Sequence, residues 1–336
     1  MKFLILQSSI YTKNLVSAIE KAGHTYEHYK PNNLYLYVSE SENGYDRLYH
    51  GDPDLETPQR LKAKDYDCVI SRIGSSLDYG ASILRHLTEN LGIYCPQTAD
   101  GLLTARDKMH TTQKLSSNGL KVPRTVMAKN PVHPDFLVKK IGGLPAVAKL
   151  LSGSQGKGVM ILESATQTNT SLESFHKVEV DLLLQSFIES GAKDKRAIVV
   201  GSEVVVAMER SGKKDFRANI SQGGSGRKIE LSQADKDICV KAAHSIGLHF
   251  AGVDIIKDSN GMTYVIEVNS NCGEKIINIT GVNYFEKLVD YCTNKDKIKE
   301  QKGTEAFISL FQNFIDLEAL GYDRTDLFSA QKPQKK

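Results

Sequence analysis

The sequence predicts an α/β protein, with an open parallel sheet in its first hundred residues and antiparallel hairpins in its second half. In the first hundred residues, short apolar runs alternate with apolar residues at helical spacing, which is typical of parallel strands joined by helices. Later, β-branched runs flank Gly201-Ser202, and two apolar runs flank Asn260-Gly261, so tight hairpin turns are expected there. The 336 residues are 40% hydrophobic and 25% charged, a globular balance that argues against a disordered chain.

The N-terminal part begins with a buried-strand pattern at residues 2–6, KFLIL. Residues 15–22 follow with apolar side chains at helical spacing. A second strand is expected at residues 68–74 and a second helix at 83–91. The intervening residues 29–64 are polar and rich in Tyr, Asn, Pro and Gly, which predicts a long surface excursion.

From residue 108 the pattern changes to short helices and β-branched strands. We expect helices at 109–120, 232–246 and 284–292, and strands at 182–185, 197–200, 204–209, 252–256 and 263–269. Near the end, apolar residues recur at i, i+3, i+4, i+7 and i+8 over residues 307–315, which predicts an amphipathic helix. The chain therefore divides into four expected segments: an N-terminal domain (1–107), a central domain (108–190), a C-terminal domain (191–295), and a charged linker with an amphipathic helix and a frayed tail (296–336).

Composition and simple motifs exclude several classes of protein. The formal net charge is +3, which by itself does not indicate nucleic acid as a required partner, and any basic partner surface would have to be local. The five cysteines are widely spaced without a C-x-x-C pair, which indicates a reduced, cytoplasmic protein and argues against a zinc ribbon. We expect no membrane association, because no stretch approaches the ~20 apolar residues of a membrane helix. The apolar run at the N-terminus is too short for a secretory signal, and no G-x-S-x-G serine-hydrolase elbow occurs.

A glycine-rich segment follows a lysine in an apolar strand. Lys149 precedes the segment GSQGKG at residues 153–158. Backbone N–H groups in such a turn can close over phosphate oxygens, and a lysine supplies a point charge to the same anion. The segment does not match a Walker loop, because the G-K-[ST] spacing is missing. A mobile hairpin loop without a ligand is the alternative.

Two acids and an amide lie on the strands that flank Asn260-Gly261. Antiparallel pairing can bring Asp254 beside Glu267, and Glu267 shares a face with Asn269 because strand periodicity is two. An oxygen-only set of donors suits Mg²⁺, which takes substrate phosphates as further ligands. The alternative is a structural ion pair or a surface face. We favour the metal, because two acids in apolar strands repel each other without a cation.

Three further features involve basic residues. Residues 210–228 hold six Lys or Arg against one acid, and are either a solvated loop or a loop that brings Arg217 and Asn219 onto an anionic reacting centre. Lys108, at a helix start, is either a surface lysine or a second phosphate lysine. Arg72 ends an apolar strand, where open α/β sheets bind ligands. A structural salt bridge is its alternative role.

The order of these motifs resembles the ATP-grasp superfamily, and most closely the RimK-type ligases that add glutamate to the C-terminus of a ribosomal protein. The resemblance covers roughly residues 1–292. It rests on the segments SRIGSSLDYG, ARDKMHTTQKL, KLLSGSQGKGV, DFRANISQGG, AGVDII and IEVN. It implies an ATP-grasp fold, in which a pre-ATP-grasp α/β domain precedes central and C-terminal α+β domains that clamp ATP.

The resemblance also implies roles for individual residues. Arg217 and Asn219 would act at the transferring phosphate, and Asp254, Glu267 and Asn269 would ligate two Mg²⁺ ions, with Mn²⁺ as a substitute and Glu267 bridging. Arg72 and Asn271 would contact substrate. The ATP-binding residues implied are Lys108, Lys149, Gly153, Ser154, Gln155, Gly156, Gly158, Gln185, Ser186, Phe187, Ile188 and Asp194.

The implied reaction is ATP-dependent joining of a carboxylate to an amine through an acylphosphate. Glutamate, or a related amino acid, would be added to the C-terminus of a protein or peptide, and a homo-oligomer is expected. One alternative is a small-molecule γ-glutamyl or peptide ligase with the same chemistry. Another is a non-catalytic nucleotide-binding protein associated with ribosomes or RNA, although binding alone does not need a full metal set.

The chain departs from the family pattern at two places. The family usually has Glu in the adenine hinge where this chain has Ser186. It commonly reads E-V-N-A-S-P-G where residues 267–273 read E-V-N-S-N-C-G. The second loop borders the substrate site, so the resemblance does not fix the acceptor or the added amino acid.

Overall fold

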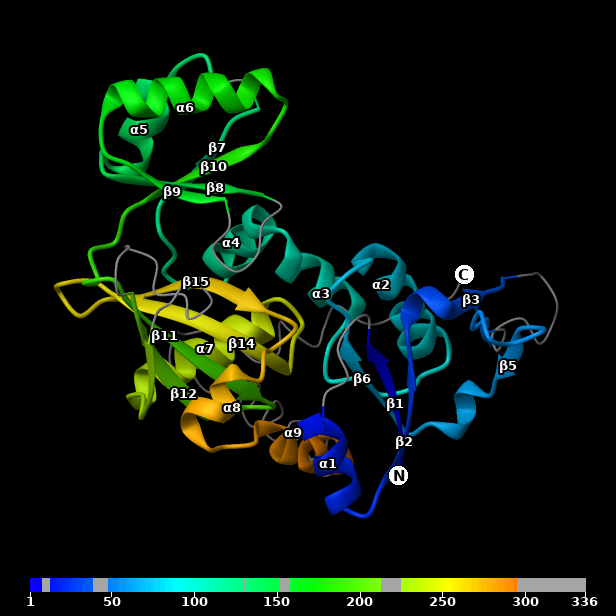
Figure 1. Cartoon of the computed structure of the whole chain (residues 1–336). Helices are drawn as coiled ribbons and strands as arrows, with labels where there is room; N and C mark the ends of the chain where they lie inside the picture. Colours follow the sequence, from blue (N-terminus) through cyan, green and yellow to red (C-terminus); the bar gives the residue numbers. More distant parts are fainter. Residues whose placement is uncertain (8–12, 39–47, 130, 152–157, 213–224, 295–336) are drawn as a thin grey trace, which may run out of the picture. The chain divides into compact units, whose positions relative to one another are not determined.

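The N-terminal strands form a parallel sheet in the order β2-β1-β6 (Figure 1). Its strands are β1 (Lys2–Gln7), β2 (Thr25–Tyr29) and β6 (Cys68–Arg72), and the helices α1 (Lys13–Lys21) and α2 (Leu77–Arg85) follow β1 and β6. The computed structural model describes the chain except residues 8–12, 39–47, 130, 152–157, 213–224 and 295–336. The parallel pairing of these strands confirms the expected α/β arrangement. The apolar run at residues 3–6 is buried, as is typical of a parallel sheet.

The polar stretch between β2 and β6 is more ordered than the sequence predicts. It contains β3 (Leu34–Leu36), β4 (Leu48–His50) and β5 (Gln59–Leu61), which pair antiparallel in that order. Each strand buries one leucine, namely Leu34, Leu48 and Leu61. The expectation of a simple surface excursion is therefore wrong. Strands of three residues with one buried side chain are too short to show periodicity in the sequence.

A second, antiparallel sheet follows in the order β7-β10-β8-β9. Its strands are β7 (Thr125–Met127), β8 (Ala146–Leu150), β9 (Val159–Leu162) and β10 (Leu182–Ser186). The helices α5 (Pro134–Ile141) and α6 (Ala165–Lys177) lie together over one face of this sheet (Figure 1). Leucines and alanines of both layers form its own small core.

The largest sheet has five antiparallel strands in the order β13-β12-β11-β14-β15. The strands are β11 (Lys193–Val200), β12 (Glu203–Ser211), β13 (Ser225–Ile229), β14 (Phe250–Lys257) and β15 (Thr263–Asn269). Helix α7 (Gln233–Ser245) packs on it. Both predicted hairpins are confirmed: β11 turns into β12 at Gly201-Ser202, and β14 turns into β15 around Asn260-Gly261.

The remaining helices connect or flank these sheets. They are α3 (Ala99–Arg106), α4 (Lys108–Ser117), α8 (Lys275–Thr280) and α9 (Tyr284–Thr293), and a π-helical turn (His86–Asn90) extends α2. The expected segment boundaries at 107/108 and 190/191 fall at the start of α4 and in the loop between β10 and β11. Residues 1–289 form one compact unit. The predicted helix at 307–315 lies outside the described residues, and no described helix has the length and apolarity to cross a membrane.

Candidate active site

The hairpin of β14 and β15 brings together the predicted metal ligands. Asp254 and Glu267 are direct partners across the hairpin, and Asn269 is the partner of Gly252. The pairing shifts just after Asp254, where one strand carries an extra residue. Asp254 is 4% exposed, whereas Glu267 and Asn269 are half-buried. The side-by-side placement that the sequence predicts is thus confirmed.

Asp254 is held by two arginines, Arg196 on the adjacent strand β11 and Arg210 on β12, the next strand beyond it. Arg196 binds it in a fork, with Nε 2.6 Å from Oδ1 and Nη2 2.5 Å from Oδ2. Arg210 adds a contact of 3.0 Å from Nη2 to Oδ2, and also pairs with Asp194 at 2.7 Å. The four side chains form a line of alternating charge, Asp194–Arg210–Asp254–Arg196, across β12, β11 and β14, which we term the charge line.

The charge line sets the ionisation of Asp254. Burial by itself raises the pKa of this carboxyl, but the charges of Arg196 and Arg210 outweigh burial and hold the pKa below its ordinary value. The argument that these acids need a metal cation is therefore wrong for Asp254, because arginine supplies the positive charge. Arg210, which the sequence places in a basic loop, is 3% exposed and belongs to β12.

Sequence reasoning missed Arg196. The signal that could have found it is the spacing of Asp194 and Arg196, two residues apart in KDKRAIVV, just before an apolar run. That spacing puts both charges on one face of a strand that is otherwise buried. The partner of Arg196 is 58 residues away in the chain, so no local pattern could name it.

Glu267 lies within electrostatic range of two lysines and has no hydrogen-bond or ion-pair partner in the described part of the chain. Among the described residues, its carboxylate has no hydrogen bond or ion pair, yet its charge acts on both Lys108 and Lys149. Burial lowers the pKa of Lys149 to about 8, an effect that Glu267 partly opposes. Burial likewise lowers the pKa of Lys108, whose Nζ donates to the carbonyl oxygen of Leu151 at 3.2 Å. We term Glu267, Lys108 and Lys149 the carboxylate–lysine cluster.

The glycine-rich segment separates β8 from β9, which pair antiparallel. Lys149 of β8 pairs with Val159 of β9, and the N–H of Leu150 donates to the carbonyl oxygen of Gly158 at 2.9 Å. Gly158 has a φ of +72°, and a Cβ there would overlap the Leu150 side chain, so this position requires glycine. The loop residues Gly153, Ser154, Gln155 and Gly156, and the predicted catalytic Arg217 and Asn219, lie outside the described residues.

The strand predicted to contact adenine is β10. The Gln185 side chain is used within the sheet, because its Nε2 donates to Thr125 Oγ1 at 2.9 Å. Ser186 Oγ accepts from the N–H of Arg124 at 3.0 Å, and the Ser186 N–H donates to the Arg124 carbonyl oxygen at 2.9 Å. Phe187 and Ile188 are half-buried in the loop that follows β10. Adenine contact by these residues stays a prediction.

The donor set fits a hard cation. Asn269 has a buried Nδ2 without a hydrogen-bond partner among the described residues, so the fold does not require this amide. The Glu267 carboxylate is equally uncommitted, and Asp254 keeps lone pairs beyond those the arginines use. Within the described ranges, no three His, Cys, Asp or Glu side chains gather at one point. A Mg²⁺ held here would therefore use two carboxylates, an amide and oxygens from its substrate.

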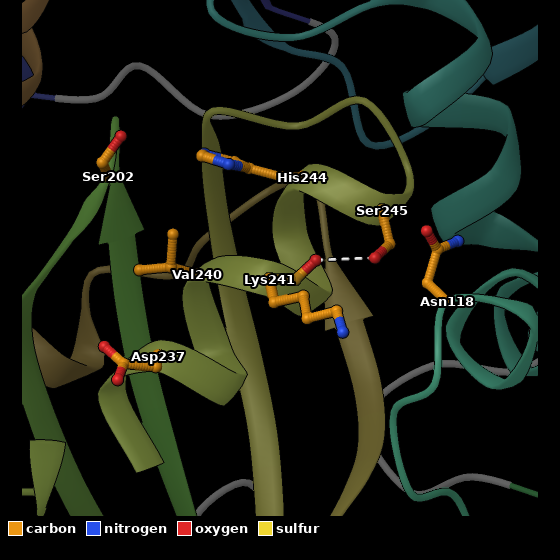
Figure 2. Close-up of a pocket in the computed structure, with 7 residues that line it drawn as sticks. All are labelled: Asn118, Ser202, Asp237, Val240, Lys241, His244 and Ser245. Atoms are coloured by element: carbon orange, nitrogen blue, oxygen red, sulfur yellow. Dashed lines mark hydrogen bonds between the residues drawn. The ribbon is translucent and has the colours of Figure 1, made fainter. Parts of the chain in front are cut away.

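A surface hollow of about 500 Å³ lies along α7 (Figure 2). Lys241 and Ser245 lie one turn apart there, joined by a hydrogen bond of 2.7 Å from Ser245 Oγ to the Lys241 carbonyl oxygen. None of the predicted site residues lines this hollow. The residues that do are Asn118, Ser202, Asp237, Val240, Lys241, His244 and Ser245. The hollow is therefore not the candidate active site, which we place at the carboxylate–lysine cluster.

Comparison with known proteins identifies the family of this chain. Residues 105–292 match the model of the RimK-like ATP-grasp domain, and residues 1–102 match that of the RimK PreATP-grasp domain. A probable alpha-L-glutamate ligase of Legionella pneumophila is 36% identical over 304 residues, which cover 88% of this chain and 97% of that protein. A protein of the same name from Maridesulfovibrio salexigens is 34% identical over 83% of this chain and 90% of its own length.

Solved structures show the same fold. The ATP-grasp ligase PsnB, in complex with minimal precursor, Mg and ADP, superposes with a TM-score of 0.67 at 16% identity, over 88% of this chain and 98% of that one. D-alanine–D-alanine ligase from Bacillus anthracis, complexed with ATP, gives a TM-score of 0.60 at 18% identity, over 90% and 99% of the two chains. The fold is thus ATP-grasp, as the sequence predicts. The two family models and the relatives together show that this chain belongs to the RimK-like ATP-grasp family and is an ADP-forming ligase.

Proposed function

We propose that this ligase adds glutamate, or a related amino acid, to the C-terminus of a protein or peptide. The observation that carries the proposal is the uncommitted Glu267 carboxylate, which lies opposite Asp254 and acts on Lys108 and Lys149. A carboxylate beside lysines whose pKa values are lowered is better suited to binding a metal ion and a triphosphate than to packing in a structural core. The relatives named as probable alpha-L-glutamate ligases support the choice of amino acid.

In the proposed reaction, the acceptor carboxylate attacks the γ-phosphorus of ATP and ADP leaves. The resulting acylphosphate is then attacked by the amine of the incoming amino acid, which forms the amide and releases phosphate and a proton. A carboxylate alone is a poor acyl donor because its leaving group would be oxide, so the enzyme's part is to position the reactants and neutralise charge. Lys108 and Lys149 would bind the ATP phosphates. Asp254, Glu267 and Asn269 would hold Mg²⁺, which would supply further charge neutralisation.

The remaining assignments are part of the same proposal. Asp254, Glu267 and Asn269 would together hold two Mg²⁺ ions, for which Mn²⁺ could substitute. Arg217 and Asn219 would act at the transferring phosphate, and Arg72 and Asn271 at the substrate. The nucleotide would also contact the glycine-rich segment (Gly153, Ser154, Gln155, Gly156 and Gly158), the strand end at Gln185, Ser186, Phe187 and Ile188, and Asp194.

An amino-acid screen tests this function. The protein, ATP and Mg²⁺ are incubated with each amino acid and a panel of peptides, and released phosphate is measured, with reactions lacking amino acid as the control. We expect glutamate-dependent phosphate release and a peptide whose mass grows by one glutamate residue per amide formed. A product of low mass formed in cell extract would indicate the small-molecule ligase instead. No turnover with any combination would contradict the proposal and favour a nucleotide-binding role.

The lowered pKa of Lys149 predicts a pH dependence of nucleotide binding. A triphosphate binds the ammonium form, and the free protein loses that proton as the pH rises through about 8. The affinity for a non-hydrolysable ATP analogue should therefore be constant near pH 7 and weaken by up to about tenfold per pH unit above 8. Titration calorimetry between pH 7 and 9.5 measures it.

The matched control for this pH dependence is Lys149→Arg, whose guanidinium stays charged throughout the range. Its affinity should change little between pH 7 and 9.5. Equal slopes in the two proteins would show that another group, such as Lys108, causes the change.

A further inference from the structure

Arg72 is a buried arginine with no carboxylate partner in the described part of the chain. It ends β6, beside Gln7 at the end of β1, and is 8% exposed. Its Nε and Nη1 have no hydrogen-bond partner among the described residues, and no described acid forms an ion pair with it. The structural salt bridge that the sequence allows as its alternative role is therefore not found in the described part of the chain.

An unpaired buried arginine is costly, and two other arginines of the described chain avoid that cost. A buried charge without an opposite charge destabilises the folded state. Arg210 is also buried and Arg196 is half-buried, and both are bound to aspartates. Arg72 instead lies over the ring of Phe285, with its Cζ 5.3 Å from the ring centre. Such a contact holds the plane of the guanidinium but supplies no acceptor for its N–H groups.

The surroundings of Arg72 connect it to the reaction centre. The ring of Phe285 lies beside Arg72, and the preceding residue, Tyr284, donates its hydroxyl to the Cys272 carbonyl oxygen at 3.1 Å. Cys272 follows the predicted ligand Asn269 closely, and its Sγ lies 3.9 Å from the Asn269 carbonyl oxygen. A chain of contacts therefore joins Arg72 to the loop that follows the predicted metal ligands.

Arg72 and the lysines have different surroundings. Lys108 donates to the Leu151 carbonyl oxygen and Lys149 lies in β8, whereas Arg72 lies in β6 over the Phe285 ring. The carboxylate that attacks ATP must reach the phosphates at the lysines. A carboxylate bound by arginine is also a weakened nucleophile. Arg72 thus suits a carboxylate that stays unmodified in the reaction.

We propose that Arg72 binds a carboxylate of the incoming amino acid through its unpaired N–H groups, and so positions the amine for attack on the acylphosphate. This inference rests on the proposed function. Arginine forms strong charge-assisted hydrogen bonds with carboxylates, and the buried setting strengthens them. Both the α-carboxylate and a side-chain carboxylate offer this chemistry, and the experiment separates them.

The test compares wild type with Arg72→Gln on the amino acid that the screen identifies and on its carboxamide analogues. For glutamate these are isoglutamine, which lacks the α-carboxylate, and glutamine, which lacks the side-chain carboxylate. In wild type, the analogue that lacks the bound carboxylate should have a KM raised by about 10- to 100-fold. In Arg72→Gln that discrimination should fall to a few-fold, with the KM for ATP unchanged.

Two variants keep the result interpretable. Arg72→Lys retains a charge and should recover part of the discrimination, and it replaces Arg72→Gln if that variant does not fold. Arg85→Gln removes an exposed arginine of the same part of the chain and should behave as wild type. If the wild type turns over and both analogues keep the same relative KM in all variants, the role of Arg72 is overturned and the ligase function stands. If no amino acid supports turnover in wild type, the proposed function fails, and this inference fails with it.

Discussion

Glu267→Ala is expected to lower the rate of ADP release by at least about 10²- to 10³-fold without unfolding the protein. The carboxylate has no hydrogen bond or ion pair in the described part of the chain, so the fold loses little when it is removed. The proposed function, in contrast, needs it to hold Mg²⁺ against the triphosphate. Steady-state ADP release at saturating ATP, together with the thermal midpoint, measures both effects.

Two variants serve as controls for this prediction. Glu203→Gln changes an exposed glutamate of the same sheet, which pairs with Lys287, and should leave ADP release unchanged. Glu267→Gln keeps the shape of the side chain and should be nearly as inactive as the alanine variant, because its neutral amide is a weaker metal ligand. More than a tenth of the wild-type rate in Glu267→Ala would remove Glu267 from the proposed metal site.

Asp254→Ala is expected to lower the free energy of unfolding by about 3–5 kcal/mol, in addition to abolishing activity. The substitution leaves the half-buried Arg196 without its forked partner, whereas Arg210 keeps Asp194. Urea unfolding at pH 7 measures the loss. The pKa of Asp254 is held below its unfolded value of about 3.9, so the stabilisation is present above that pH and is lost as the pH falls through the folded pKa. The difference between wild type and Asp254→Ala should therefore shrink in acid.

The matched controls for Asp254 test the ion pair and the position separately. Asp237→Ala removes an exposed aspartate on α7 and should cost less than about 0.5 kcal/mol. The double variant Asp254→Leu with Arg196→Met replaces the pair by apolar groups and should recover much of the lost stability. A loss below about 1 kcal/mol in Asp254→Ala would mean that the arginines find other partners.

The sequence was sufficient to predict the features of the site that depend on local patterns. β-branched runs around Asn260-Gly261 predict a hairpin, and the period of two then places Asp254 beside Glu267. The strand that precedes the glycine-rich segment was predictable too, because Lys149 lies in an apolar run directly before it. The resemblance extended these local patterns to an ATP-grasp fold, which the comparisons confirm.

Features that depend on distant pairing could not be predicted in this way. The fork between Arg196 and Asp254 joins β11 to β14, and nothing near either residue identifies the other. The burial of Arg210 is hidden by the glycines and lysines that follow it, since these suggest a solvated loop. The small sheet of β3, β4 and β5 escapes notice because its strands are short and half polar. The roles of Arg217 and Asn219 stay predictions, because both lie outside the described residues.

The charge line has a consequence for how this enzyme can change over generations. Its two aspartates and two arginines sum to zero, so the interior of the largest sheet carries no excess charge. A single substitution by a neutral residue at any of the four positions would leave one unit of uncompensated charge in the charge line. Related proteins should therefore carry paired, charge-compensating replacements at these positions. The loop after Asn269 is free of this constraint and can vary to change the substrate.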